Sequence, residues 1–379
     1  MGQGPRLGEE GGVGAPSGKE VIERLGLVGL PNSGKSALFN ALTGGDAVVA
    51  SHPFSTTETQ VGVAAVADHR LHALAQMSRS RKVVAATLEL VDIAGLVAGA
   101  SAGEGLGNRF LGGIREVDAV LLVLRAFADD SVVGSNDPTA DLHTLELELV
   151  MADLESAETQ LAKRRKMAKG DPGAAAEATV LEAAVDVLGG GMPLYRSALS
   201  ADQRAALRPM FLLTNKPVLA VVNLGEDQLA DADDIVKPVA AELGGAADVL
   251  AVSVQLEAEA AQLDPGSRAE LLEGLGLGEG ALPRVVRAAY HLLGRRTFFT
   301  TGDKESRAWT FRAGARAPEC AGVIHSDLQR GFIRAEVIRW DALLELGSWA
   351  SAKDAGKLRV EGKDYEVADG DVLEIRFNV

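Results

Sequence analysis

The chain of 379 residues is long enough for two or three domains with buried cores, and its 47% hydrophobic content is that of a globular protein. Its formal net charge of −15 excludes a protein that coats nucleic acid through bulk charge, although a local basic patch remains compatible. The single cysteine, Cys320, excludes a disulfide framework and is expected to be a small buried hydrophobe. No apolar run reaches the roughly 18 residues of a membrane helix. Together these features predict a cytoplasmic protein without a membrane partner.

The chain begins with a Gly-rich stretch of mixed charge, residues 1–20, which predicts a flexible tail because it lacks the apolar core of a signal peptide. Short apolar runs then alternate with helical patterns. Near-continuous apolar strands between helices are typical of a parallel sheet that is covered on both faces. The expected strands are 25–28, 88–92, 119–124, 217–222 and 249–252.

Residues 29–36, Gly-Leu-Pro-Asn-Ser-Gly-Lys-Ser, match the phosphate-binding pattern G-x-x-x-x-G-K-S between an expected strand and a helical stretch at 37–42. Gly29 and Gly34 would let backbone N–H groups wrap closely around a triphosphate. Lys35 would reach the β- and γ-phosphate oxygens, and the Ser36 hydroxyl would bind Mg²⁺. The alternative is a Gly-rich turn without a ligand. The expected phosphate-binding residues are Asn32, Ser33, Gly34, Lys35, Ser36 and Ala37.

A second motif, Asp92-Ile93-Ala94-Gly95, follows the strand 88–92. In P-loop proteins an Asp at this strand end holds Mg²⁺ through water, and the glycine amide reads the γ-phosphate. Thr56, with Thr57 as the alternate, would complete the Mg²⁺ shell once a γ-phosphate is present, unless both are ordinary loop residues. The expected metal ligands are therefore Ser36, Thr56 and Asp92.

The region 141–209 reads as an insertion into the α/β sheet. Helical patterns at 141–170 and 174–188 are separated by the breaker Gly-Asp-Pro-Gly at 170–173, and a third short helix is expected at 201–209. This order predicts an antiparallel helical hairpin. Its tip is basic and is either a phosphate-backbone contact or a solvated helix end. The basic residues are Lys163, Arg164, Arg165, Lys166 and Lys169.

From residue 297 onward, short alternating segments at 307–311, 332–338 and 372–377 predict half-buried strands of a small α+β domain. The expected organisation is a tail at 1–20, a P-loop domain at 21–140 and 210–296, a helical insertion at 141–209 and a C-terminal domain at 297–379.

Four segments resemble the Obg-related translation-factor GTPases and, within them, the YchF family of Obg-like ATPases: 31–36, 52–54, 92–97 and 103–108. The C-terminal part is similar to the same family at 297–300, 307–310, 321–327, 330–336, 361–365 and 376–379. The resemblance implies a G domain with a helical insertion, followed by a ubiquitin-like β-grasp module called TGS. It also implies ribosome association, through the basic hairpin tip and the TGS module, for a protein expected to be a monomer. His325 is expected to be a packed structural histidine of that module.

The segment Asn223-Leu224-Gly225-Glu226 stands where such GTPases carry Asn-Lys-x-Asp, the motif that reads guanine. Leu224 replaces the lysine and Glu226 replaces the aspartate, so the carboxylate no longer fits the two guanine donors. YchF-like proteins share this departure, and the resemblance implies a preference for ATP over GTP. It also implies a base contact at Ser253, Val254 and Gln255.

The sequence leaves the catalytic group open, because it departs from the patterns of related enzymes at two positions. Leu96 stands where Ras-type enzymes orient water with a glutamine, and Gly113 stands where YchF-like proteins carry a histidine. The candidates for the catalytic machinery are therefore Lys35, Thr56 and Gly95. Asn32 either supports a bound K⁺, as in related P-loop proteins, or only shapes the loop.

The leading hypothesis is a ribosome-associated P-loop ATPase of YchF type that acts as a nucleotide-dependent switch with Mg²⁺. Two alternatives stay open: an Obg-like GTPase, and a nucleotide-gated ribosome-binding scaffold with negligible turnover.

Overall fold

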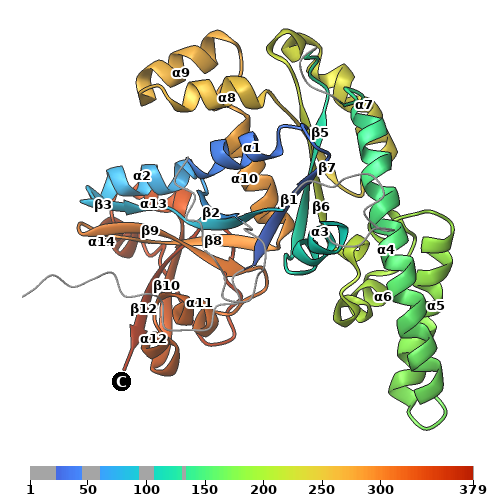
Figure 1. The fold of residues 1–379 in the computed structure, drawn as a ribbon. Coiled ribbons are helices and arrows are strands. Elements are labelled where there is room, and N and C mark those ends of the chain that lie inside the picture. Colours follow the sequence, from blue (N-terminus) through green and yellow to red (C-terminus); the bar gives the residue numbers. More distant parts are fainter. Residues whose placement is uncertain (1–22, 45–59, 94–105, 130–133, 379) are drawn as a thin grey trace, which may run out of the picture. The chain divides into compact units, whose positions relative to one another are not determined.

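The computed structural model describes residues 23–44, 60–93, 106–129 and 134–378, so the predicted tail at 1–20 lies outside the described residues (Figure 1). The chain forms two compact units. The larger unit comprises residues 22–67 and 87–294, and the smaller unit joins residues 68–86 to residues 295–379.

The larger unit is built on a six-stranded sheet in the order β2-β4-β1-β5-β6-β7. All neighbouring pairs are parallel except β2 with β4. The central strands β5 and β6 are buried along their whole length, which confirms the predicted covered parallel sheet. The strands are β1 (Arg24–Gly29), β2 (Gln60–Ala65), β4 (Thr87–Asp92), β5 (Ala119–Arg125), β6 (Val218–Asn223) and β7 (Asp248–Val252).

The helices of the larger unit connect its strands or follow β7, and those at 106–115 and 232–243 share one apolar core with the sheet (Figure 1). Those of the sheet region are α1 (Lys35–Thr43), α3 (Leu106–Arg115), α7 (Ala232–Leu243), α8 (Val254–Ala261), α9 (Pro265–Gly274) and α10 (Ala281–Leu292). Short 3₁₀ turns lie at η1 (Leu194–Arg196), η2 (Arg208–Met210), η3 (Leu213–Asn215) and η4 (Glu226–Asp231).

The insertion is a helical hairpin of α4 (Pro138–Met167) and α5 (Pro172–Gly189), followed by α6 (Ala201–Ala206) (Figure 1). Asp137 and Asp171 accept backbone N–H bonds at the starts of α4 and α5, each with a proline in the first turn. Leucines and alanines of both helices form one apolar cluster between them. The sequence prediction of a hairpin broken near residue 171 is confirmed.

Buried carboxylates attach the first half of α4 to the rest of the larger unit. Asp141 accepts a bond from the Arg125 backbone N–H at 3.1 Å. Glu146 pairs with Arg196 at 2.6 Å, and Asp153 accepts from the backbone N–H of Leu213 at 2.8 Å. Burial raises the pKa of the Asp141 and Asp153 carboxyls above their ordinary values, against the opposing effect of these bonds. The base of the hairpin is therefore fixed by specific polar contacts as well as apolar packing.

The smaller unit has a mixed six-stranded sheet in the order β11-β10-β12-β8-β9-β3, with helices packed against it. Its core gathers buried aromatic and aliphatic residues of the strands with Ala317, Cys320 and Ala321 of α11. This is the arrangement expected of a β-grasp module. Its elements are α2 (His69–Ser78), β3 (Lys82–Val84), β8 (Arg295–Thr301), β9 (Glu305–Arg312), α11 (Ala317–Ile324), α12 (Ser326–Arg330), β10 (Phe332–Arg339), α13 (Trp340–Leu346), α14 (Trp349–Asp354), β11 (Arg359–Glu361) and β12 (Asp371–Phe377).

Residues 68–86 were assigned by sequence to the P-loop domain, and the structure corrects this boundary. The strand β3 pairs in parallel with β9, from Lys82 opposite Glu305 onward. Arg70 Nη1 donates to Asp369 at 2.7 Å, and Ser80 Oγ donates to the Gly302 carbonyl at 2.6 Å. The sequence of a short amphipathic helix shows that it has an apolar face but not which core covers that face. The local pattern therefore could not reveal that residues 68–86 belong to the smaller unit.

His325 was expected to be packed, but its side chain is exposed. It acts structurally nonetheless, because Nδ1 accepts from the Asp327 N–H at 3.1 Å and caps α12. Cys320 is fully buried as predicted, and burial raises the pKa of its thiol to about 12. Among the residues that the structure describes, no helix combines the length and apolar character required to cross a membrane.

Candidate nucleotide-binding site

The predicted phosphate loop joins the end of β1 to the start of α1. Gly29 lies against β5, where a Cβ would come 2.8 Å from the Val123 carbonyl oxygen. Gly34 has φ of 88°, and a Cβ there would collide with Asn223 Nδ2. Gly29 is therefore required by the close approach of β5, and Gly34 by its left-handed backbone and the nearby Asn223 side chain, as the motif predicted. Residues 30–37 line a cavity of about 450 Å³ at the N-terminus of α1.

Lys35, Ser36 and Asp92 meet at the edge of this cavity. The Lys35 ammonium contacts Asp92 Oδ1, and Ser36 Oγ donates to Asp92 Oδ2 at 3.0 Å. Asp92 reaches this position because β4 pairs with β1, with Asp92 opposite Leu27. A hydroxyl beside a carboxylate is a donor set of the kind that Mg²⁺ takes beside phosphates, so the residues present fit that ion. Two predicted metal ligands thus lie together with the predicted phosphate-binding lysine.

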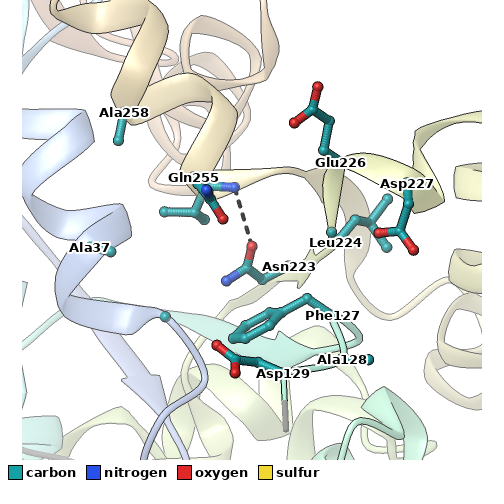
Figure 2. A pocket seen from close by; sticks show the side chains of 13 residues that line it. Ala37, Phe127, Ala128, Asp129, Asn223, Leu224, Glu226, Asp227, Gln255 and Ala258 are labelled. Atoms are coloured by element: carbon teal, nitrogen blue, oxygen red, sulfur yellow. Dashed lines mark hydrogen bonds between the residues drawn. The ribbon is translucent and has the colours of Figure 1, made fainter. Parts of the chain in front are cut away.

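A second cavity, of about 830 Å³, adjoins the first, because Gly34 and Ala37 line both. Figure 2 shows its walls: one segment follows β5, a second follows β6, and a third is the start of α8. The three groups converge at the carboxyl ends of parallel strands, where α/β sheets bind ligands. The lining residues are Gly34, Ala37, Phe127, Ala128, Asp129, Asn223, Leu224, Gly225, Glu226, Asp227, Val254, Gln255 and Ala258.

Asn223 connects the segments around this cavity, and its side chain is buried. Nδ2 donates to the Ser33 carbonyl at 3.0 Å, and Oδ1 accepts from the Val254 N–H at 3.2 Å (Figure 2). Its own carbonyl accepts from the N–H groups of Ala126 and Phe127. The first residue of the predicted base-reading motif therefore fixes the phosphate loop against two cavity walls.

The other predicted base-end residues differ in exposure. Leu224 lines the cavity from within the apolar core, whereas Glu226, at the start of η4, is exposed to solvent. Val254 and Gln255 line the cavity from α8, and Ser253 does not line it although it is buried beside them. The cavity thus has an apolar side at Leu224 and a carboxylate at its rim.

Sequence reasoning missed the wall formed by Phe127, Ala128 and Asp129, and the lining residues Asp227 and Ala258. One signal was available for the first wall. These residues follow the apolar strand 119–124, whose carboxyl end must share the sheet edge that carries the phosphate loop. No local motif marks them, so only the strand order reveals their position.

Thr56, Thr57, Gly95 and Leu96 lie outside the described residues. Gly113 lies in α3, where a Cβ would come 3.1 Å from Ile93 Cγ2. Asn32 has a left-handed backbone with φ of 65°, a conformation that asparagine tolerates better than most residues.

The basic hairpin tip lies at the C-terminal end of α4 and in the turn to α5. Two of its cations fold back onto α5: Arg164 pairs with Glu177 at 2.6 Å, and Arg165 pairs with Glu182 at 2.8 Å. Lys163, Lys166 and Lys169 are exposed.

The sheet order, the glycine-bounded phosphate loop and the adjoining Ser36–Asp92 pair define a P-loop nucleoside triphosphatase fold. A family model described as a 50S ribosome-binding GTPase matches residues 24–165. A model of the YchF-type GTPase C-terminal domain, described as a protein of unknown function, matches residues 296–378.

Whole-length relatives agree with both matches. The chain is 44% identical over 361 residues to the ribosome-binding ATPase YchF of Bacillus subtilis (strain 168), covering 93% of this chain and 99% of the relative. It is 44% identical over 362 residues to the protein of that name from Escherichia coli O157:H7, covering 94% and 99%. The solved structure of the Schizosaccharomyces pombe YchF GTPase superposes with a TM-score of 0.82 at 30% identity, covering 94% of this chain and 98% of that one. The chain belongs to the YchF family.

Proposed function

We propose that this chain is a ribosome-associated P-loop ATPase that binds ATP more tightly than GTP and uses its hydrolysis as a switch. The observation that carries the proposal is the joined pair of cavities. One is bounded by the phosphate loop, and the other is lined by Asn223, Leu224 and Glu226 in place of the usual guanine-reading residues. A base in the second cavity would leave its phosphates in the first.

The phosphate end supplies most of the binding free energy in this proposal. Backbone N–H groups of residues 32–37 cradle the phosphate oxygens, and Lys35 moves from Asp92 to the β- and γ-phosphates when the nucleotide enters. Ser36 and Asp92 hold Mg²⁺, with Thr56 as the third predicted ligand. The bound ion would neutralise charge that develops on the transferred phosphoryl group.

The base end supplies selectivity. Asn223 holds the walls, Leu224 presents an apolar surface, and the Glu226 carboxylate sits one methylene further from its backbone than an aspartate would. Val254, Gln255 and Ala258 add the remaining wall. Adenine has no N1–H to donate, so it loses less than guanine where the aspartate is absent.

The hydrolytic step is proposed to be slow in the free protein. A glycine at position 113 and a leucine at position 96 orient no water, so acceleration would come from a ribosomal partner or from K⁺ bound near Asn32. Association with the ribosome is assigned to the exposed tip lysines and to the smaller unit. Association with the ribosome implies a cytoplasmic location. The protein is proposed to act as a monomer.

Calorimetric titration with ATP, GTP and their non-hydrolysable analogues tests the nucleotide assignment. We expect the dissociation constant for ATP to be lower than that for GTP in Mg²⁺, and both to rise when EDTA removes the ion. Tighter binding of GTP would identify the Obg-like GTPase alternative instead.

Single-turnover hydrolysis, with and without ribosomes, separates the ATPase from a scaffold with negligible turnover. We expect ribosomes to accelerate phosphate release, and a rate that stays at the uncatalysed level in both conditions contradicts the proposal. Parallel rates in K⁺ and Na⁺ buffers test the K⁺ assignment, because equal rates would remove it.

A further inference from the structure

Two side chains outside the base cavity hold two of its walls, which adjoin because the strands before them, β5 and β6, are paired (Figure 2). One wall is the segment Phe127–Asp129 after β5, and the other is the segment Leu224–Asp227 after β6. Arg125 and Gln228 are absent from the cavity lining, yet each makes bonds to the backbone of these segments. Neither belongs to a nucleotide-binding motif of the sequence.

Gln228 lies in η4 and joins both walls through one amide group. Its Oε1 accepts from the Gly225 N–H at 2.8 Å, and its Nε2 donates to the Ala126 carbonyl at 3.1 Å. Gly225 lies between Leu224 and Glu226, and Ala126 precedes Phe127. A half-buried amide of fixed length therefore sets the separation between the two segments.

Arg125 contacts the segment Phe127–Asp129 from outside the cavity, and it is only 3% exposed. Its Nε donates to the Phe127 carbonyl at 3.1 Å, and its guanidinium carbon lies 4.5 Å from the centroid of the Phe127 ring. The fork geometry and planar face of a guanidinium make both contacts at once, which a lysine cannot do. The Phe127 ring is therefore fixed in orientation as well as position.

We propose that Gln228 and Arg125 are positioning residues of the base cavity, which fix the relative placement of these two walls and thereby the preference between adenine and guanine without touching the nucleotide. The proposal rests on the proposed nucleotide function and adds the device that shapes the selective end. Because both residues bond to backbone atoms of the walls, loss of either loosens the cavity while the phosphate loop keeps its own contacts to Asn223.

Substitution of Gln228 tests the proposal with little change in size. Gln228→Glu replaces the donor to the Ala126 carbonyl by an oxygen, and Gln228→Met removes both bonds. Arg125→Lys keeps the charge near Asp141 but loses the fork and the stacking. The matched control is Gln160→Glu in α4, because Gln160 Nε2 also donates to a backbone carbonyl, that of Met210 at 3.2 Å, away from the cavity.

Dissociation constants for ATP, GTP and inorganic tripolyphosphate are measured for each full-length variant with Mg²⁺. We expect the ratio of the GTP to the ATP constant to move toward one by about fivefold in the Gln228 and Arg125 variants, as for a lost hydrogen bond. Tripolyphosphate affinity stays within about twofold because it reports the phosphate loop alone, and Gln160→Glu leaves the ratio unchanged.

An unchanged ratio in both Gln228 variants overturns the positioning role of Gln228, whether or not thermal stability falls. An unchanged ratio in Arg125→Lys overturns that of Arg125. The wild-type ratio is a separate result. A wild-type chain that prefers GTP overturns the ATPase proposal, whereas the change in ratio on substitution still decides the role of Gln228 and Arg125.

Discussion

The two ends of the proposed nucleotide cavity are built in different ways. The phosphate end is formed by one continuous stretch, residues 30–37, together with Asp92 from the neighbouring strand. The base end is assembled from separate segments after β5, after β6 and at the start of α8, and side chains fasten them to one another. Binding through backbone amides needs only a correctly wound loop, whereas selectivity needs several segments held at fixed separations. Substitutions at the two ends should therefore have different effects.

The largest effect is expected from Lys35→Ala at the phosphate end. In the proposed site the lysine would supply charge-assisted bonds to two phosphates, so its loss should weaken ATP and GTP equally by about 100-fold. Calorimetric titration in Mg²⁺ measures both constants. Lys237→Ala, which removes an exposed cation on α7, is the control and should bind normally. A loss confined to one of the two nucleotides would contradict the division between the ends.

Asn223→Ala should affect both ends, because Asn223 joins them. Its removal leaves the buried Ser33 carbonyl and Val254 N–H without their partner, which we expect to lower the free energy of unfolding by about 2 kcal/mol. Urea unfolding followed by circular dichroism measures this change. Asn215→Ala, which removes a comparable amide-to-carbonyl bond to Arg204, is the control for stability alone. We expect only Asn223→Ala to weaken nucleotide binding, and normal ATP and GTP affinity in that variant would contradict its connecting role.

Glu226→Asp should act at the base end alone and more weakly. The shorter carboxylate returns the guanine-reading geometry at one position, so we expect GTP to gain about tenfold relative to ATP. Competition between the two nucleotides for one labelled analogue measures the ratio. Glu273→Asp on the exposed side of α9 is the matched control, because Glu273 does not line the cavity. If both variants give the wild-type ratio, Glu226 does not read the base.

The smallest effect on nucleotide binding is expected at the hairpin tip. Reversing Lys163, Lys166 and Lys169 to glutamate should leave ATP affinity unchanged and lower ribosome cosedimentation several-fold, with the residual binding less dependent on salt. Replacing Arg164 and Arg165, which pair with α5, should change cosedimentation less. Equal cosedimentation of wild type and the lysine variant would remove the tip from the ribosome contact.

The difference between the two ends also explains what the sequence could predict. Lys35 and Ser36 belong to a contiguous motif, and Asp92 ends a strand whose apolar run is plain, so local patterns were enough to predict residues that the structure brings together. The core strands were likewise predicted, because an apolar run bounded by helices has few other places in a fold. Phe127 and Gln228 escaped prediction because their proposed roles depend on which strand ends become neighbours.

The same reasoning applies to the correction at residues 68–86. The helix α2 has a clear apolar face, with Leu71 and Leu74 almost fully buried. Nothing in its own sequence states that the covering partners are β8, β9 and α13, which follow more than 200 residues later. Both units have an apolar core, and long-range packing decides which of them covers this helix, so its own sequence carries no signal for that choice.

The assignment of residues 68–86 to the smaller unit has a consequence for how the gene can be divided. A chain that ended at residue 294 would lose β8 to β12 but would still carry α2 and β3, with Leu71 and Leu74 stripped of their cover. A fragment that began at residue 295 would lack an edge strand and a helix of its own sheet. Residues 295–379 are therefore not a domain that can be separated by one cut in the chain. Recombination that exchanged them alone would give two incomplete products, each with apolar surface exposed to water.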